Sequence, residues 1–158
     1  MANPYGGSGN DERETPLDVF DALHWRFNFT VDVACTGANA KMARAYSGPC
    51  GGPSCSLCGL HCSWEGERVW CNPPYSDIGP WVTKAMGQRF GTVTMLLPLV
   101  SAAKWAWPIW ENFDRILVVK HRIQFVNGGA NPKDSMVVHW DNTRTHTRER
   151  VIEPWTWK

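Results

Sequence analysis

The chain has 158 residues, of which 43% are hydrophobic and 20% are charged, a composition typical of one soluble globular domain. Its formal net charge is +1, so a globally basic nucleic-acid-binding protein is excluded and any basic surface must be local. No apolar run reaches the roughly 18 residues that a membrane-spanning helix needs, so we expect no membrane partner and a reducing cytoplasmic compartment.

The first fourteen residues are rich in glycine, asparagine and charged side chains. They lack the apolar core of a signal peptide, so residues 1–14 are expected to form a disordered leader. Thr15 and Pro16 then precede an amphipathic stretch, residues 17–25. This pattern predicts a helix that is capped by Thr15 and carries proline in its first turn.

A predicted strand, residues 27–34, follows and carries Asp32 near its end. A turn of small residues at 35–39 comes next, and residues 38–46 are expected to form a short helix. Strand, tight turn and helix in this order make an anion- or cofactor-binding corner at the carboxyl edge of an α/β sheet. The single glycine in the turn, Gly37, is a weak signal by itself.

Four of the six cysteines lie in residues 48–64, which contain few large apolar side chains and cannot fold by burying a core. The spacing of Cys55 and Cys58 is that of a zinc knuckle, and disulfides are disfavoured in a reducing compartment. We therefore predict a closed, structural Zn²⁺ site without a catalytic role, in which His61 is a possible substitute for one thiolate. The alternative is a flexible loop with unliganded thiols. The predicted ligands are Cys50, Cys55, Cys58 and Cys62.

The most informative motif is Asn72-Pro73-Pro74-Tyr75, at the end of a predicted strand over residues 68–71. The two prolines lack backbone N–H groups and have a fixed φ, so the carbonyls of Asn72 and Pro73 are not consumed by a continuing strand. What remains is a stiff set of acceptors, one amide and one aromatic ring. Such a site suits a planar group with an exocyclic amine.

Helices and strands alternate through the rest of the chain. Helices are predicted at residues 78–89 and 101–113, the second kinked or ended by Pro108. Strands are predicted at residues 91–98, 115–120, 123–126 and 135–140, and the last two are expected to pair as a hairpin. This order predicts an α/β fold with a mostly parallel sheet and an antiparallel C-terminal hairpin. Residues 15–140 would form one domain with the cysteine loop inserted, and residues 141–158 a basic tail or, alternatively, a merely solvated segment.

Five segments together resemble the phage-type DNA N6-adenine methyltransferases, the Dam-like family of phages and prophages. They are Thr15-Pro16, Phe29-Thr30-Val31-Asp32-Val33-Ala34, Val69-Trp70-Cys71-Asn72-Pro73-Pro74-Tyr75-Ser76, Met95-Leu96-Leu97-Pro98 and His121-Arg122-Ile123-Gln124-Phe125. The resemblance covers residues 15–140 and implies a minimal, Rossmann-like methyltransferase fold. It further implies transfer of a methyl group from S-adenosylmethionine to adenine N6 in DNA. The cofactor-binding residues it implies are Thr15, Pro16, Asp32, Ala34, Thr36 and Gly37.

The resemblance assigns catalysis to Asn72, Pro73, Pro74 and Tyr75. The Asn72 side-chain oxygen and the Pro73 carbonyl would accept the two N–H groups of the adenine amine, and Tyr75 would stack on the flipped-out base. Neither a covalent intermediate nor a general base is required.

The chain departs from larger methyltransferases in lacking a separate target-recognition domain. Recognition of the DNA sequence must then depend on short segments of the chain, so we expect a short or relaxed recognition sequence. Arg122 is the candidate DNA contact, and a structural ion pair at the sheet edge is the alternative. Two other functions stay open at this point. One is methylation of an RNA base or a glutamine amide, and the other is a non-catalytic, zinc-containing nucleic-acid-binding protein.

Overall fold

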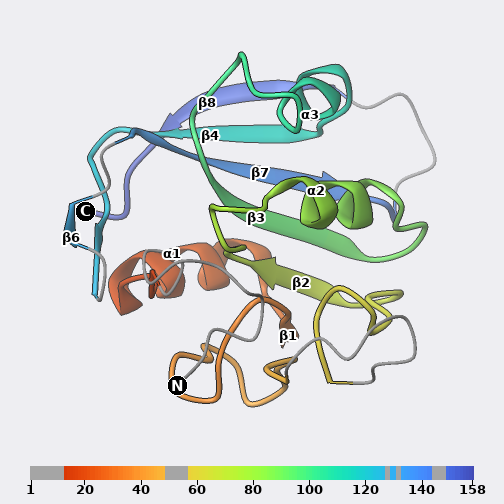
Figure 1. The fold of residues 1–158 in the computed structure, drawn as a ribbon. Helices are drawn as coiled ribbons and strands as arrows, with labels where there is room; N and C mark the ends of the chain where they lie inside the picture. Colours follow the sequence, from red (N-terminus) through yellow and green to blue (C-terminus); the bar gives the residue numbers. More distant parts are fainter. Residues whose placement is uncertain (1–12, 49–56, 127–128, 131–132, 144–148) are drawn as a thin grey trace.

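The computed structural model describes residues 13–48, 57–126, 129–130, 133–143 and 149–158, and Figure 1 shows their arrangement. A six-stranded sheet forms the centre of the molecule, and a two-stranded hairpin stands beside it. This mixed α/β arrangement fits a Rossmann-like fold. In chain order the elements are α1 (Leu17–Phe27), β1 (Val31–Asp32), β2 (Arg68–Cys71), α2 (Gly79–Met86), β3 (Thr92–Pro98), α3 (Trp107–Glu111), β4 (Arg115–Val119), β5 (Gln124–Phe125), β6 (Gly129–Ala130), β7 (Ser135–Asp141) and β8 (Val151–Trp155).

The strand order in the large sheet is β1-β2-β3-β7-β4-β8. All neighbours are parallel except at β7, which runs antiparallel to both β3 and β4. The predicted pairing of residues 123–126 with residues 135–140 is therefore wrong. Five of the seven residues of β7 are buried, so the strand needs a neighbour on each side and lies inside the sheet, while β5 pairs with β6 instead.

Strand β8 was not predicted. It lies in residues 141–158, where sequence analysis expects a basic tail, and it pairs in parallel with β4 at the edge of the sheet. Its intermediate and exposed residues alternate, as in a strand with one solvated face. Three basic residues of that segment lie outside the described residues: Arg144, His146 and Arg148.

Three local predictions need correction. Thr15 does not cap α1, because the residue at the cap is Pro16 and no side chain caps the helix. Pro108 neither kinks nor ends the predicted helix over residues 101–113, because it stands in the first turn of the short α3, where its missing N–H is harmless. Residues 38–46 form turns and bends instead of a helix, since Tyr46 donates its N–H to the Asp32 carbonyl and the segment lies along β1.

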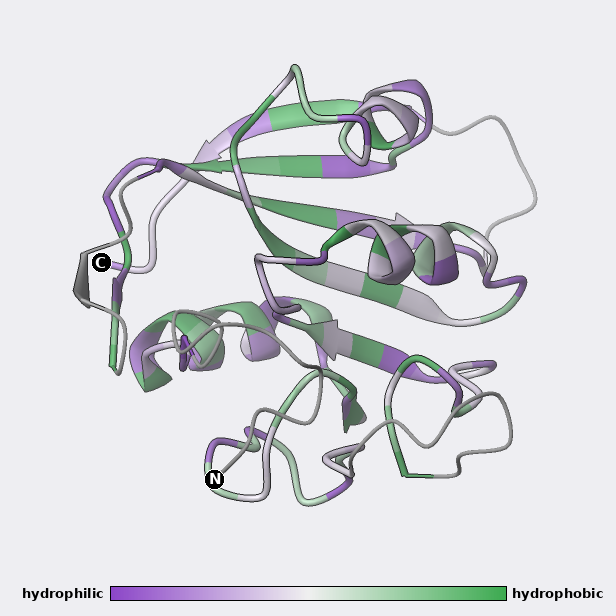
Figure 2. Ribbon diagram, viewed as in Figure 1, coloured by the Kyte–Doolittle hydropathy of each residue, from purple (hydrophilic) through white to green (hydrophobic). Residues whose placement is uncertain are grey.

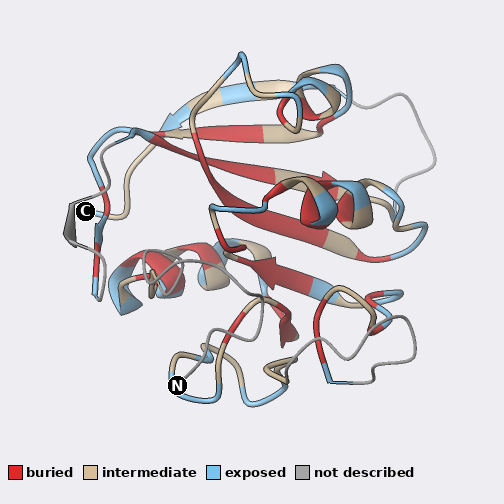
Figure 3. Cartoon of the chain, in the orientation of Figure 1, coloured by how far each residue is buried: buried red, intermediate tan, exposed pale blue. Residues whose placement is uncertain are grey.

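Two hydrophobic cores hold the layers together. One lies between the sheet and the helices α2 and α3, and the other lies between the opposite face of the sheet and α1. The central strands are the most apolar and the most deeply buried part of the chain (Figures 2 and 3). Four tryptophans are almost fully buried: Trp64, Trp70, Trp81 and Trp140. None of the helices that the structure describes is long and apolar enough to cross a membrane.

Candidate active site

The candidate site lies at the carboxyl ends of β1 and β2. These strands pair in parallel, with Asp32 opposite Trp70, so Asp32 and the loop that begins at Asn72 reach the same edge of the sheet. The prolines of that loop, Pro73 and Pro74, are buried. The topology thus brings together the two parts of the site that are separated in the sequence by the cysteine loop.

The Asn72 side chain is held in one orientation. Its Nδ2 donates to the Arg13 carbonyl at 2.8 Å and to the Thr15 Oγ1 at 3.1 Å. A carbonyl can only accept, so the amide nitrogen must point toward Arg13 and the amide oxygen away from it. Thr15, which is 2% exposed, therefore positions the predicted catalytic side chain instead of capping a helix.

The Oδ1 atom of Asn72 is buried and accepts no hydrogen bond from any residue that the structure describes. A buried acceptor without a donor costs about 1–3 kcal/mol. Native proteins keep few such groups, and those they keep often mark a functional site. This oxygen is available to a donor that enters from outside the chain.

The rings of Tyr75, at the end of the loop that begins at Asn72, and Phe125 are in contact. The Tyr75 ring is perpendicular to the ring of the buried Phe125, and the ring centroids are 6.2 Å apart. The guanidinium of Arg13 lies over both rings, with Cζ 5.5 Å from the Tyr75 centroid and 6.0 Å from the Phe125 centroid. Burial raises the pKa of the Tyr75 hydroxyl, whose oxygen has no hydrogen-bond partner among the described residues. We call this arrangement the aromatic slot.

Asp32 organises the turn that follows β1. Its carboxylate accepts the backbone N–H of Ala34 at 3.3 Å and that of Lys41 at 2.9 Å. Burial raises the pKa of Asp32 to about 6, although both hydrogen bonds oppose the rise. Further along the turn, the Asn39 side chain accepts the N–H of Thr36 at 2.7 Å. Both side chains therefore shape the turn from within.

A small cavity joins this turn to the loop that begins at Asn72. Four predicted site residues line it, namely Thr15, Asp32, Ala34 and Asn72, whereas Pro16, Thr36 and Gly37 do not. The other lining residues were not among the predicted site residues: Arg13, Glu14, Cys35, Asn39, Lys41 and Trp70.

Two of the missed residues form an ion pair across the cavity lining. The Lys41 Nζ lies 2.7 Å from the Glu14 carboxylate, and the two side chains are 10% and 24% exposed. The sequence signal that could have indicated Glu14 is its position directly before Thr15-Pro16, at the end of a run of charged residues. The partner of Glu14 could not be read from the sequence, because Lys41 lies in a segment expected to be helical.

The thiols of Cys35 and Cys71 are buried, and burial raises the pKa of both. Thiols in this state are poor nucleophiles. They act as small core residues, as the apolar pattern around them predicts.

Only part of the cysteine loop is described, since Cys50 and Cys55 lie outside the described residues. Cys58 and Cys62 are buried on one turn, in which the Cys62 N–H donates to the Cys58 carbonyl at 3.0 Å. The His61 Nδ1 lies 3.1 Å from the Cys58 Sγ. Among the described residues, no group of three or more His, Cys, Asp or Glu side chains is arranged to hold a metal ion.

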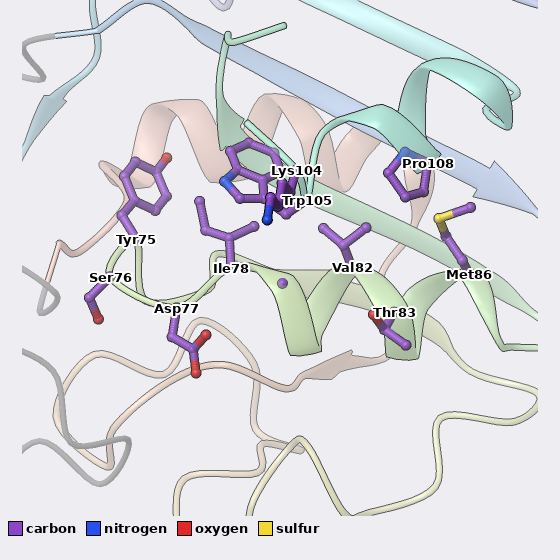
Figure 4. Close-up of a pocket in the computed structure, with 11 residues that line it drawn as sticks. Tyr75, Ser76, Asp77, Ile78, Val82, Thr83, Met86, Lys104, Trp105 and Pro108 are labelled. Atoms are coloured by element: carbon purple, nitrogen blue, oxygen red, sulfur yellow. The ribbon is translucent and has the colours of Figure 1, made fainter. Parts of the chain in front are cut away.

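Arg122 lies just before the β5–β6 hairpin, and its Nε is 3.5 Å from the Asp134 carboxylate. Both side chains are more than half exposed, so this pair holds Arg122 only weakly. A groove of about 470 Å³, with Tyr75 at one end, lies between α2 and residues 104–108 (Figure 4). Lys104 and Trp105 face α2 across this groove.

Comparison with known proteins gives two matches. The family model described as "DNA N-6-adenine-methyltransferase (Dam)" matches residues 7–150. The chain is also 36% identical over 126 residues to a protein named "DNA N-6-adenine-methyltransferase" from Haemophilus phage HP1 (strain HP1c1), a similarity that covers 76% of this chain and 69% of that protein. The range of the family match includes every residue of the site described above, whereas β8 lies outside it.

Proposed function

The chain belongs to the DNA N-6-adenine-methyltransferase (Dam) family, and from this premise we propose that it transfers a methyl group from S-adenosylmethionine to N6 of an adenine flipped out of DNA. Membership in the family makes it a DNA N6-adenine methyltransferase; the cofactor, the flipped base and the roles of single residues are the proposal. One observation carries these roles. The buried Asn72 Oδ1 needs a donor, and the adenine amine brings two.

The adenine amine is a poor nucleophile because its lone pair is delocalised into the ring. Acceptance of its two N–H groups by Asn72 Oδ1 and the Pro73 carbonyl favours a pyramidal nitrogen whose lone pair is free to react. Both acceptors are held in place before the base arrives, Asn72 by its two hydrogen bonds and Pro73 by its ring. Catalysis is then preorganisation, which lowers the barrier without a covalent intermediate.

The flipped base enters the aromatic slot. Tyr75 stacks on its face and Phe125 bounds it from the side, since the two rings are perpendicular. Pro74 holds Tyr75 in register with Asn72, because the rigid loop fixes the distance between them. Phe125 is thus an addition to the predicted catalytic set.

S-adenosylmethionine, when bound, supplies a methyl group on a positively charged sulfur. The carboxylates of Glu14 and Asp32 and the ammonium of Lys41, which line the cavity beside Asn72, complement the charges of the methionine end of this cofactor. The cavity itself has a volume of only about 20 Å³, so the Glu14–Lys41 pair would have to open to admit that end. We keep Thr15, Pro16, Asp32, Ala34, Thr36 and Gly37 as cofactor residues and add Glu14, Asn39 and Lys41. Asp32 and Asn39 would act by holding the turn in shape.

Transfer of tritium from methyl-labelled S-adenosylmethionine to DNA, RNA or protein tests the proposal directly. Label is expected in DNA as N6-methyladenine, and label found only in RNA or protein would contradict the proposed substrate. Asn72→Ala and Tyr75→Ala should each lower kcat by at least about a hundredfold, the range for loss of a preorganised catalytic group. Asn112→Ala and Phe90→Ala, exposed residues away from the site, are the matched controls.

For DNA contact we propose Arg122, which the weak pair with Asp134 leaves available to a phosphate. The chain would meet this DNA in the cytoplasm of a phage's bacterial host. Arg122→Ala is expected to weaken DNA binding several-fold and to lower the slope of log Kd against log salt by about 1. An unchanged slope would remove Arg122 from the interface. Methylated positions mapped on DNA from expressing cells should show a short or relaxed recognition sequence.

We also propose that the cysteine loop binds one structural Zn²⁺ through Cys50, Cys55, Cys58 and Cys62, with His61 as a possible substitute for one thiolate. The support is local: the buried Cys58 and Cys62 lie on a single turn, and the His61 imidazole is 3.1 Å from the Cys58 thiol. The loop leads directly into β2, so loss of the metal should lower activity as well as stability. Elemental analysis should find about one zinc per chain. Fully active protein without zinc would contradict both claims.

A further inference from the structure

We propose that Arg13 occupies the place of the target base, and that a base must displace its guanidinium to enter the aromatic slot. Arg13 would then be a specificity-determining residue that no motif or family match assigns. The inference rests on the proposed function, because it takes the slot to be the site of the flipped adenine.

The position of the guanidinium is the first observation. It lies over the rings of Tyr75 and Phe125, with Cζ within about 6 Å of both centroids. A guanidinium is planar and rich in nitrogen, and it stacks on aromatic faces much as a nucleobase does. The aromatic slot, where we place the flipped base, therefore already holds a group of similar shape and chemistry.

The backbone of Arg13 is the second observation. Its carbonyl accepts from Asn72 Nδ2 at 2.8 Å, and the carbonyl of the next residue, Glu14, accepts from the Val126 N–H at 3.1 Å. The Glu14 side chain is paired with Lys41. These contacts hold the backbone at residues 13 and 14, and none of them involves an atom of the Arg13 side chain.

The consequence is a threshold for entry. A base that enters gains stacking but must replace the contacts between the guanidinium and two rings. A base that also donates a hydrogen bond to the buried Asn72 Oδ1 gains more binding free energy than a base that leaves this acceptor unpaired. Arg13 therefore lowers the apparent affinity for every base and leaves adenine, with its amine, best able to exceed the threshold.

The test measures binding of a duplex that contains the mapped target adenine and of the same duplex with an abasic site at the target position. Only the first places a base in the slot. Arg13→Ala keeps the carbonyl that orients Asn72 and removes the competitor. For this variant, the ratio of the affinity for the adenine duplex to the affinity for the abasic duplex is expected to be about tenfold higher than for the wild type. A tenfold change corresponds to the free energy of a pair of partly desolvated cation–π contacts.

Arg13→Lys and Arg26→Ala complete the comparison. Arg13→Lys keeps the positive charge. If Arg13 acted only on phosphate, this variant would bind both duplexes as the wild type does. Arg26 lies over Phe27 at the same distance, 5.5 Å, at the far end of α1, and its replacement should leave the ratio unchanged. A second expected result is faster methylation by Arg13→Ala of an adenine opposite a mismatched base.

Two outcomes overturn the inference. In one, Arg13→Ala weakens binding of both duplexes equally, as a lost phosphate contact would. In the other, the ratio does not change while the melting temperature shows that the variant is folded. If either outcome is found but the wild-type protein methylates adenine, the proposed function stands and only the role of Arg13 is refuted. If the wild-type protein does not methylate adenine, the proposed function itself is refuted.

Discussion

The free energy of unfolding is expected to depend on pH through the titration of Asp32. The side chain is 2% exposed, and burial raises its pKa from the ordinary 3.8 to about 6. A carboxyl whose pKa is higher in the folded state binds protons more tightly when folded. Its contribution to stability is therefore fully present below about pH 4 and is lost as the pH rises through 6. A rise from 3.8 to about 6 corresponds to about 3 kcal/mol.

Asp32→Asn removes this titration. The amide keeps an oxygen for one of the two backbone N–H groups, those of Ala34 and Lys41, at every pH. The stability of the wild type relative to the variant should therefore fall by about 2 kcal/mol between pH 4 and pH 7, most of the full difference. Whatever the variant costs in hydrogen bonds is constant across this range and drops out of the comparison.

Urea unfolding at pH 4, 5, 6 and 7, followed by tryptophan fluorescence, measures this difference. Asp21→Asn, which removes an exposed carboxyl from α1, is the matched control. A difference between wild type and Asp32→Asn that stays constant within about 1 kcal/mol would refute the reasoning. It would mean that water or a counter-charge stabilises the carboxylate in the folded protein.

Two further predictions concern the shape of the site. Thr15→Val removes the hydroxyl that accepts from Asn72 at 3.1 Å, so kcat should fall about three- to tenfold with little change in the Kd for DNA; a change in Kd alone would contradict a positioning role. Gly59→Ala would place a Cβ 1.7 Å from the Val33 carbonyl oxygen and should lower the free energy of unfolding by about 1–3 kcal/mol or more. Gly79→Ala, which meets nothing closer than 3.9 Å, is its control in urea unfolding, and equal effects of the two would contradict the packing argument.

Much of the site was predictable from short stretches of sequence. The strand before Asn72 forms as expected, because a short apolar run followed by two prolines has few other structures open to it. A strand also forms at Asp32, but it spans only Val31–Asp32 instead of the predicted residues 27–34, because α1 continues to Phe27; α2 lies within the predicted residues 78–89. Parallel pairing of successive strands then places both polar ends at one edge of the sheet, as the order of elements implies.

The strand at residues 135–141 shows where this reasoning fails. Its apolar residues indicate a buried strand, but they do not say which strands lie beside it. A hairpin with residues 123–126 has the shorter loop, whereas insertion between β3 and β4 buries both faces of the strand. The second arrangement forms because the free energy gained by burying apolar surface exceeds the extra entropic cost of closing the longer connection.

The finest details of the site depend on contacts between residues that are far apart in the sequence. Thr15 and Arg13 meet Asn72 across 57 and 59 positions, and these contacts, not the motif, determine which atom of the amide faces the slot. Phe125 and Arg13 complete the slot from segments on either side of Tyr75 that are similarly distant in the sequence. Local patterns establish that a rigid acceptor loop exists, because proline restricts φ wherever it occurs. Which groups surround that loop follows from the packing of the whole chain, because no short-range rule connects a residue before α1 with one in β5.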